Sequence, residues 1–188
     1  LQSCDNDELK MLGRIHTFEQ FLENYNLARE VGFDNINIDI MQSLPFQTMD
    51  KYKKTLEQVI ALRPEHISSY SLIIEEGTPL YSRNDLLEYL PDEDTEREIY
   101  YLTNDLLLQN GYHHYEISNY ALDSRECKHN LGYWNRDNYI GIGVGAASLV
   151  DSFRFNNIRD TDEYIELVNS YSGGSLLDQP WIDKDTIE

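Results

Sequence analysis

Three polar residues stand where predicted strands end or have just ended: Gln2, Arg14 and Asp39. Asp39 is the most unusual, because it lies inside the apolar run NINIDIM and a carboxylate is rarely buried without a partner. An arginine fork suits a ligand carboxylate, and Asp or Gln can accept hydrogen bonds from ligand ammonium or hydroxyl groups. The pattern predicts a small-ligand site, and a structural Arg14–Asp39 ion pair is the alternative.

A second candidate site is the segment His129-Asn130-Leu131-Gly132-Tyr133-Trp134. It places an imidazole, an amide and two large aromatic rings in a stretch with little periodicity. A histidine beside flat aromatic surface has the composition of an axial haem ligand with a packing wall. A capping histidine with two core aromatics explains the same residues equally well. His113 and His114 are adjacent in a predicted strand, so they point to opposite faces and cannot share one metal.

The glycine run from Gly141 to Ala146 formally fits a dinucleotide-binding fingerprint, and Asp160 and Asp162 follow it downstream. The preceding residues 133–138 do not form a buried strand, so a nucleotide site of this type is not favoured. We expect the glycines to permit close backbone approach to another strand or to a ligand.

Alternating helices and strands position these residues. The run from Asn35 to Pro45 alternates with period two, which predicts a strand with its isoleucines against helices and Asn37 and Asp39 on a ligand-facing side. Asp5 and Thr17 each begin a predicted helix with a capping box, closed by Glu8 and Gln20. Further helices are predicted over 50–62 and 92–110, and further strands over 66–74 and 113–117. This spacing is typical of βαβ units and favours a parallel sheet or barrel.

The pattern changes near residue 120. Residues 118–138 are polar, aromatic and loop-like, whereas 153–158 alternates as a strand and Asp160 begins a helix to about Ser170. We therefore expect residues 1–120 to belong to one domain and residues 121–188 to begin another.

Composition excludes some function classes. The chain has 15 Lys and Arg against 34 Asp and Glu, a net charge of −19, which disfavours a nucleic-acid partner. There is no apolar run near the ~18 residues that a membrane span needs. Two isolated cysteines, Cys4 and Cys127, do not make a disulfide framework and favour a reduced, cytoplasmic setting. The ends of the chain, without an initial Met, predict an internal piece of a longer protein.

Taken together, six motifs resemble the radical S-adenosylmethionine (SAM) enzymes of the oxygen-independent coproporphyrinogen III oxidase family. They occur in family order: Leu1-Gln2-Ser3, Leu12-Gly13-Arg14, Asn37-Ile38-Asp39 with Leu44-Pro45, Tyr115-Glu116-Ile117-Ser118-Asn119-Tyr120-Ala121, His129-Asn130 with Tyr133-Trp134, and Gly141-Ile142-Gly143. The Tyr-Glu-Ile-Ser-Asn and His-Asn-x-x-Tyr-Trp motifs favour the HemW branch, the haem chaperones, over the oxidase itself.

The resemblance implies an α/β fold: the C-terminal half of a partial (β/α)6 TIM-like radical SAM barrel, followed by the start of a small C-terminal α+β domain. It implies SAM binding at Gln2, Arg14 and Asp39, with apolar contacts from Ile73 and Ala147, and it makes His129 the candidate haem iron ligand.

The family also holds a [4Fe–4S] cluster on a Cys-x3-Cys-x2-Cys loop, which this chain lacks, so the cluster ligands are expected outside it and the piece alone is expected to be inactive. The family usually has Tyr-Gly where Gln42-Ser43 stand.

The implied function is that of a cytoplasmic protein that binds haem, SAM and a cluster and hands haem to an acceptor protein, through which it could meet a membrane surface. One alternative is the oxidase, which decarboxylates porphyrin propionates. Its polyanionic substrate requires a binding site lined by Lys and Arg, which the acidic composition disfavours. The other alternative is a non-catalytic interaction domain that retains the fold.

Overall fold

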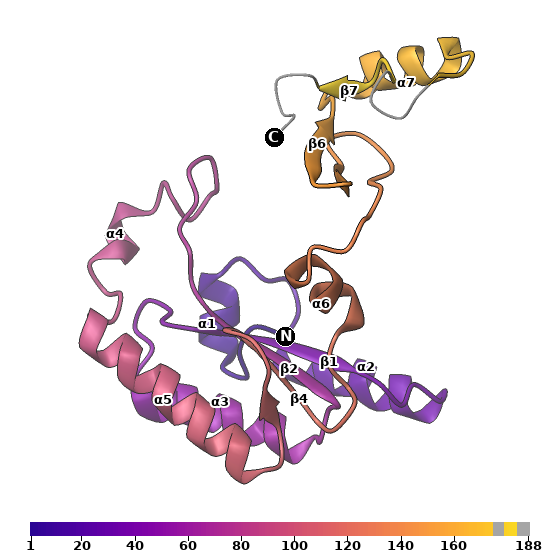
Figure 1. The fold of residues 1–188 in the computed structure, drawn as a ribbon. Helices are drawn as coiled ribbons and strands as arrows, with labels where there is room; N and C mark the ends of the chain where they lie inside the picture. Colours follow the sequence, from indigo (N-terminus) through magenta and orange to yellow (C-terminus); the bar gives the residue numbers. More distant parts are fainter. Residues whose placement is uncertain (175–178, 184–188) are drawn as a thin grey trace. The chain divides into compact units, whose positions relative to one another are not determined.

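The structure is a computed structural model that describes residues 1–174 and 179–183 (Figure 1). The chain divides into two compact units, Leu1–Glu126 and Cys127–Glu188, called unit 1 and unit 2 below. That residues 1–120 and 121–188 belong to different domains stays a prediction. Among the described residues, no helix combines the length and apolarity needed to cross a bilayer.

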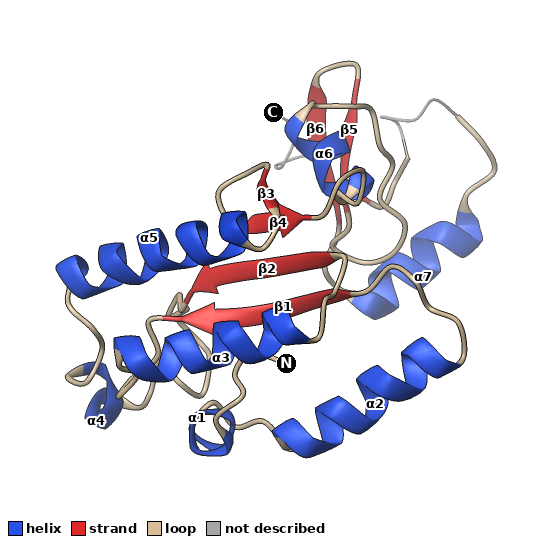
Figure 2. Ribbon diagram, turned by 90° about the horizontal axis from the view of Figure 1, so that it is seen from below, coloured by secondary structure: helices blue, strands red, loops and turns tan. Residues whose placement is uncertain are grey.

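The sheet of unit 1 begins with parallel strands. Strands β1 (Asn37–Gln42) and β2 (His66–Ser71) lie side by side and point the same way (Figure 2). Gln2 adds a parallel bridge on the other edge of β1: its backbone N donates to the Asp39 carbonyl at 2.8 Å, and its carbonyl accepts from Met41 N at 2.8 Å. The predicted parallel arrangement is confirmed for these three segments.

The other side of β2 is antiparallel. Strand β4 (Asn119–Ala121) pairs with β2 and with the short strand β3 (His113–His114), giving the order β1-β2-β4-β3. The strand predicted over 113–117 is present only at His113–His114, and the prediction of a loop from 118 onward was wrong at Asn119–Ala121. A tight turn, in which Tyr115 N donates to the Asn119 carbonyl at 3.3 Å, reverses the chain, and a three-residue strand is too short to show a period.

Five helices accompany this sheet. They are α1 (Asn6–Met11), α2 (Phe18–Glu30), α3 (Met49–Ala61), α4 (Asn84–Leu87) and α5 (Glu93–Gln109). Helices α3 and α5 contact each other, and α3 packs on β1 (Figure 2). The helix predicted over 50–62 is present as α3, and four of its large side chains are buried: Tyr52, Leu56, Val59 and Ile60.

The start signals of two helices had different outcomes. The Thr17–Gln20 capping box of α2 is present, as predicted. Asp5 does cap α1, but Glu8 does not close a box, because its carboxylate turns inward. It accepts hydrogen bonds from Ser3 Oγ at 2.6 Å and Gln47 Nε2 at 3.1 Å. The Glu8 carboxylate therefore bonds side chains outside α1 instead of the backbone N–H at the start of its own helix.

The two faces of β1 differ as the alternation predicts. Ile38 and Ile40 are buried in the helix-covered core together with Ile67 of β2, whereas Asn37 is exposed and Asp39 is half-buried. The sheet therefore has one apolar face under the helices and one polar face on which ligand-binding side chains can lie.

Unit 2 is built around an antiparallel sheet of order β5-β6-β7. Its elements are α6 (Lys128–Trp134), β5 (Ala147–Val150), β6 (Phe153–Asn157), α7 (Thr161–Ser170) and β7 (Ile182–Asp183). Asp151 and Ser152, with φ of 48° and 73°, make the tight turn between β5 and β6. Helix α6 lies where the sequence predicted a loop. Its glycine and paired aromatics have weak helix propensity, so packing decides its conformation.

Ser43 gives a first prediction. It stands where the resembling family has glycine, its φ is 62°, and its buried Oγ has no hydrogen-bond partner in the described part of the chain. Ser43→Gly removes both the left-handed strain and the unsatisfied hydroxyl, so we expect the free energy of unfolding to rise by about 1 kcal/mol. Urea denaturation measures it. Ser43→Ala is the control, since it removes only the hydroxyl and should gain less; equal gains would contradict the role of φ.

Candidate functional site

The polar face of unit 1 brings together two of the predicted ligand residues. Gln2 and Asp39 lie on neighbouring parallel segments and share a backbone hydrogen bond. Gln2 has a φ of 74°, a left-handed conformation that is costly for a residue with a side chain. Such strain is often found at ligand sites, where the surrounding structure holds it in place.

Tyr70 lies among all three predicted polar residues, and sequence reasoning missed it. Burial raises the pKa of the Tyr70 phenol, and the Asp39 carboxylate raises it further, whereas Gln2 and Arg14 act in the opposite direction through hydrogen bonding and positive charge. Gln2 therefore acts on the Tyr70 hydroxyl by hydrogen bonding, and Asp39 and Arg14 act on it through their charges. The period-two pattern of β2, in which His66, Ser68 and Tyr70 share a face, was the available signal.

Arg14 and Asp39 do not form the ion pair that was the structural alternative. No salt bridge joins them in the described part of the chain. Arg14 follows helix α1 rather than a strand and is exposed. Both charges are therefore available to a ligand.

A chain of side-chain hydrogen bonds holds the Asp39 carboxylate. Asn37 Nδ2 donates to Asp39 Oδ1 at 2.7 Å, so its amide oxygen faces the other way and accepts from His66 Nδ1 at 2.6 Å. His66 Nε2, left as the acceptor of a neutral imidazole, lies 2.7 Å from the Tyr115 hydroxyl. The tyrosine of the Tyr-Glu-Ile-Ser-Asn motif is thus linked through β2 to the carboxylate on β1.

With Nε2 as an acceptor, this chain of hydrogen bonds corresponds to a neutral His66. Burial lowers the pKa of His66, although the carboxylates of Asp39, Glu116 and Glu126 act in the opposite direction. Because the folded protein resists protonation of His66, the unfolded chain binds a proton more readily below the ordinary histidine pKa of about 6.5. The stability that His66 contributes is complete above that pH and is lost as the pH falls through it.

We therefore expect the free energy of unfolding of unit 1 to fall between pH 7 and pH 5.5, by at most about 1.4 kcal/mol per pH unit from this residue. Urea denaturation followed by far-UV circular dichroism measures it. His66→Gln should flatten this part of the pH profile. An unchanged slope in His66→Gln would contradict the assignment.

Ile73 and Ala147, predicted to give apolar contacts to SAM, have different surroundings. Ile73 lies two residues beyond the end of β2 and is 77% exposed. The predicted strand over 66–74 was therefore too long. Ala147 begins β5 in unit 2, where it lines the larger cavity described below.

The described residues do not fit an iron–sulfur cluster. No group of three or more His, Cys, Asp or Glu side chains within residues 1–174 and 179–183 could hold a metal ion. Burial raises the pKa of the Cys4 thiol to about 12, so it stays protonated at neutral pH, and its Sγ donates to the Thr55 carbonyl at 3.8 Å. A cluster needs thiolates, so Cys4 cannot serve.

In unit 2, His129 lies in the first turn of α6 and is exposed. Its ring lies edge to face against the ring of Tyr133, with 4.7 Å between the ring centroids. The rings of Tyr133 and Tyr139 are also edge to face, with 4.7 Å between their centroids. These three side chains line a cavity of about 220 Å³. The imidazole has no side-chain hydrogen bond among the described residues, so it neither caps a helix nor is satisfied in a core. Both ring nitrogens can bind a ligand.

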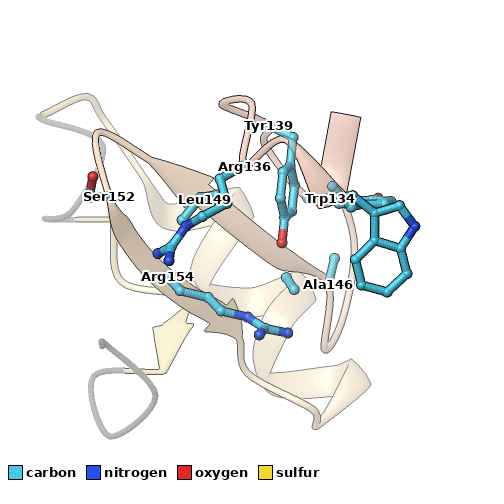
Figure 3. A pocket seen from close by; sticks show the side chains of 10 residues that line it. Trp134, Arg136, Tyr139, Ala146, Leu149, Ser152 and Arg154 are labelled. Atoms are coloured by element: carbon cyan, nitrogen blue, oxygen red, sulfur yellow. The ribbon is translucent and has the colours of Figure 1, made fainter. Parts of the chain in front are cut away.

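A larger cavity of about 810 Å³ lies next to the first and shares Tyr133 and Tyr139 with it (Figure 3). Its other lining residues include Trp134, Arg136, Ala147 and Arg154. The ring of Tyr139 and the side chain of Arg154 extend into this space in Figure 3. Sequence reasoning singled out the histidine and the aromatic residues but missed both arginines, because no pattern along the chain connects them.

Comparison with models of protein families finds no match. Among curated proteins, the chain is similar to the heme chaperone HemW of Lactococcus lactis (38% identical over 167 residues, 88% of this chain and 44% of that protein). The chain is also similar to the HemW protein of Bacillus subtilis, at 36% identity over 89% of this chain and 45% of that protein. It is similar to the HemW protein of Escherichia coli at 40% identity, over 78% of this chain and 38% of that protein. The chain thus spans less than half the length of these relatives.

Among solved structures, the fold is similar to that of Escherichia coli coproporphyrinogen III oxidase (HemN), described as a radical SAM enzyme. The TM-score is 0.73 at 21% identity, covering 97% of this chain and 44% of that one. At this identity the likeness concerns the fold, which is of mixed α/β content.

Proposed function

Because this chain is similar to the HemW haem chaperones over most of its length, we propose that it is part of a haem chaperone of the radical SAM family. In this proposal His129 ligates haem iron, and the complete protein transfers haem to an acceptor protein. A cytoplasmic location and the partial (β/α)6 barrel are parts of the same proposal.

The observation that carries the proposal is the setting of His129. Its imidazole is exposed, lines a cavity, and stands edge to face against Tyr133. An axial haem ligand needs a free ring nitrogen and flat apolar surface beside it, and this arrangement offers both. The oxidase alternative is supported by likeness of fold alone.

The proposal includes SAM, held by the polar face of unit 1. The Asp39 carboxylate would accept hydrogen bonds from ribose hydroxyls or the ammonium group, and the exposed Arg14 would bind the SAM carboxylate. The strained backbone of Gln2 and the absence of an Arg14–Asp39 salt bridge among the described residues support this choice. Ile73 and Ala147 are included on the resemblance alone. Cluster ligands would have to come from outside the described residues.

Haem titration tests the function. The Soret band of haem added to the purified chain should shift and saturate, and His129→Ala should weaken binding at least about tenfold, or 1.4 kcal/mol, through loss of the axial ligand. His113→Ala is the control, since His113 pairs with Asp123 in unit 1 and should leave the affinity unchanged. Equal affinities in the two variants would remove His129 as the ligand.

A further inference from the structure

The larger cavity of unit 2 is lined by positive charge, although the chain as a whole has a negative net charge. The sequence has 34 acidic and 15 basic residues, yet among the described residues this cavity is lined by two arginines and no carboxylate. Arg136 follows α6 and Arg154 lies on β6, so different elements bring the two guanidinium groups to one space. In so acidic a protein, a cavity of positive charge favours an anionic ligand.

Both guanidinium groups are free to bind. In the described part of the chain neither forms a salt bridge or a side-chain hydrogen bond. An unpaired guanidinium presents a planar fork of donors that matches a carboxylate with two parallel hydrogen bonds.

The backbone at Arg136 is a second, independent observation. Its φ is 60°, and it follows the C-cap Asn135 at the position where helices usually have glycine. Arg136 N donates to the Tyr133 carbonyl, and Asp137 N donates to the Gly132 carbonyl, as in a helix end built for glycine. The Cβ of a non-glycine residue costs stability at such a position, and here the left-handed turn carries a guanidinium group that lines the cavity.

The cavity is also lined by aromatic rings. Tyr133 and Trp134 are 43% and 66% exposed, and Tyr139 lies between the two cavities. A volume of about 810 Å³ lies within the range of roughly 300–1,000 Å³ typical of small-molecule sites. Exposed rings in a cavity of this size suit a large planar ligand that stacks on them.

We infer that this cavity binds the porphyrin as a dicarboxylate: Arg136 and Arg154 bind the two propionates, and Tyr133, Trp134 and Tyr139 contact the macrocycle. The inference deepens the proposed haem function and rests on it for the identity of the ligand. Since the cavity shares Tyr133 and Tyr139 with the cavity of His129, the porphyrin site and the imidazole are neighbours in unit 2. No bond is made or broken in this binding.

The inference also changes the role of Ala147. SAM carries a sulfonium cation, and two arginines without a carboxylate oppose a cation. Ala147 lines this cavity, so its methyl group would contact the porphyrin rather than SAM.

The test uses metal-free protoporphyrin IX, whose fluorescence reports binding without iron and therefore without His129. Arg136→Gln and Arg154→Gln should each weaken its binding about tenfold, and the double variant about a hundredfold, because each removes a charged hydrogen-bonding partner. Arg159→Gln, an exposed arginine of unit 2 that does not line the cavity, should leave the affinity unchanged. Circular dichroism of each variant establishes that it is folded.

The dimethyl ester of the same porphyrin separates charge from shape. It lacks both carboxylates, so its affinity should be equal in the original chain and in the arginine variants. Unchanged protoporphyrin affinity in the folded double variant, or an equal loss for porphyrin and ester, would overturn the inference even if His129→Ala still weakens haem binding. The opposite outcome is also informative. If the arginine variants weaken the binding of metal-free porphyrin but His129→Ala leaves the haem affinity unchanged, the inference is upheld and His129 is not the iron ligand.

Discussion

Gly141→Ala is expected to lower the free energy of unfolding of unit 2 by about 3 kcal/mol, because a methyl group has no space there. A Cβ at this position would clash with the Ala147 carbonyl oxygen and lie 2.9 Å from Ala146 atoms. These contacts are mainly with backbone, which cannot rotate away as the end of a side chain can.

The surrounding hydrogen bonds prevent the loop from moving aside. Gly141 N donates to Ser148 Oγ at 2.9 Å, and the buried Asn157 donates from Nδ2 to the carbonyls of Gly141 at 3.3 Å and Gly143 at 2.8 Å. The close backbone approach predicted for the glycine run is confirmed, and its partner is the start of β5.

Tryptophan fluorescence in urea measures this effect, since the only tryptophans, Trp134 and Trp181, both lie in unit 2. Gly132→Ala is the matched control: it lies in α6, and its added Cβ would be at an ordinary 3.5 Å from Asp137. Alanine should there be neutral or stabilise by up to about 1 kcal/mol through helix propensity. Equal unfolding midpoints in the two variants would contradict the steric argument.

Ile40→Ala is expected to lower the free energy of unfolding of unit 1 by about 3 kcal/mol, within the range for a substitution that leaves a cavity in a packed core. Ile40 is 0% exposed, lies in the centre of the β1 strand, and shares the core with Leu56 and Ile67. Removing three carbon atoms leaves a void that β2 on one side and the bridged Gln2 on the other cannot fill by moving.

Ile73→Ala provides the same chemical change at a side chain that is 77% exposed, so it should alter stability by no more than about 0.5 kcal/mol. Far-UV circular dichroism in urea follows unit 1 well, because its helices α2, α3 and α5 are the longest of the chain. A comparable loss in both variants would show that Ile73 is buried in solution, as a contact residue of a closed site would be.

Several features were predictable because they depend on neighbours along the chain. The alternation of β1, the Thr17–Gln20 capping box and the buried side of α3 follow from period and capping chemistry, which act over a few residues. The same rules failed at Glu8, whose carboxylate bonds Gln47, 39 residues away, instead of its own helix start. They also failed at β4 and α6, where short elements carry no period.

The candidate sites divide in the same way. The functional groups follow from the residues along the chain: the carboxylate of Asp39 on a polar strand face, and the imidazole of His129 with aromatic rings beside it. Their surroundings arise from the folded chain. The His66–Tyr115 contact joins residues 49 apart, and the cavity of Arg136 and Arg154 joins a helix end to a strand. Such groupings arise from chain packing, which no local pattern records, and they decide whether a charged side chain is paired or remains free to bind.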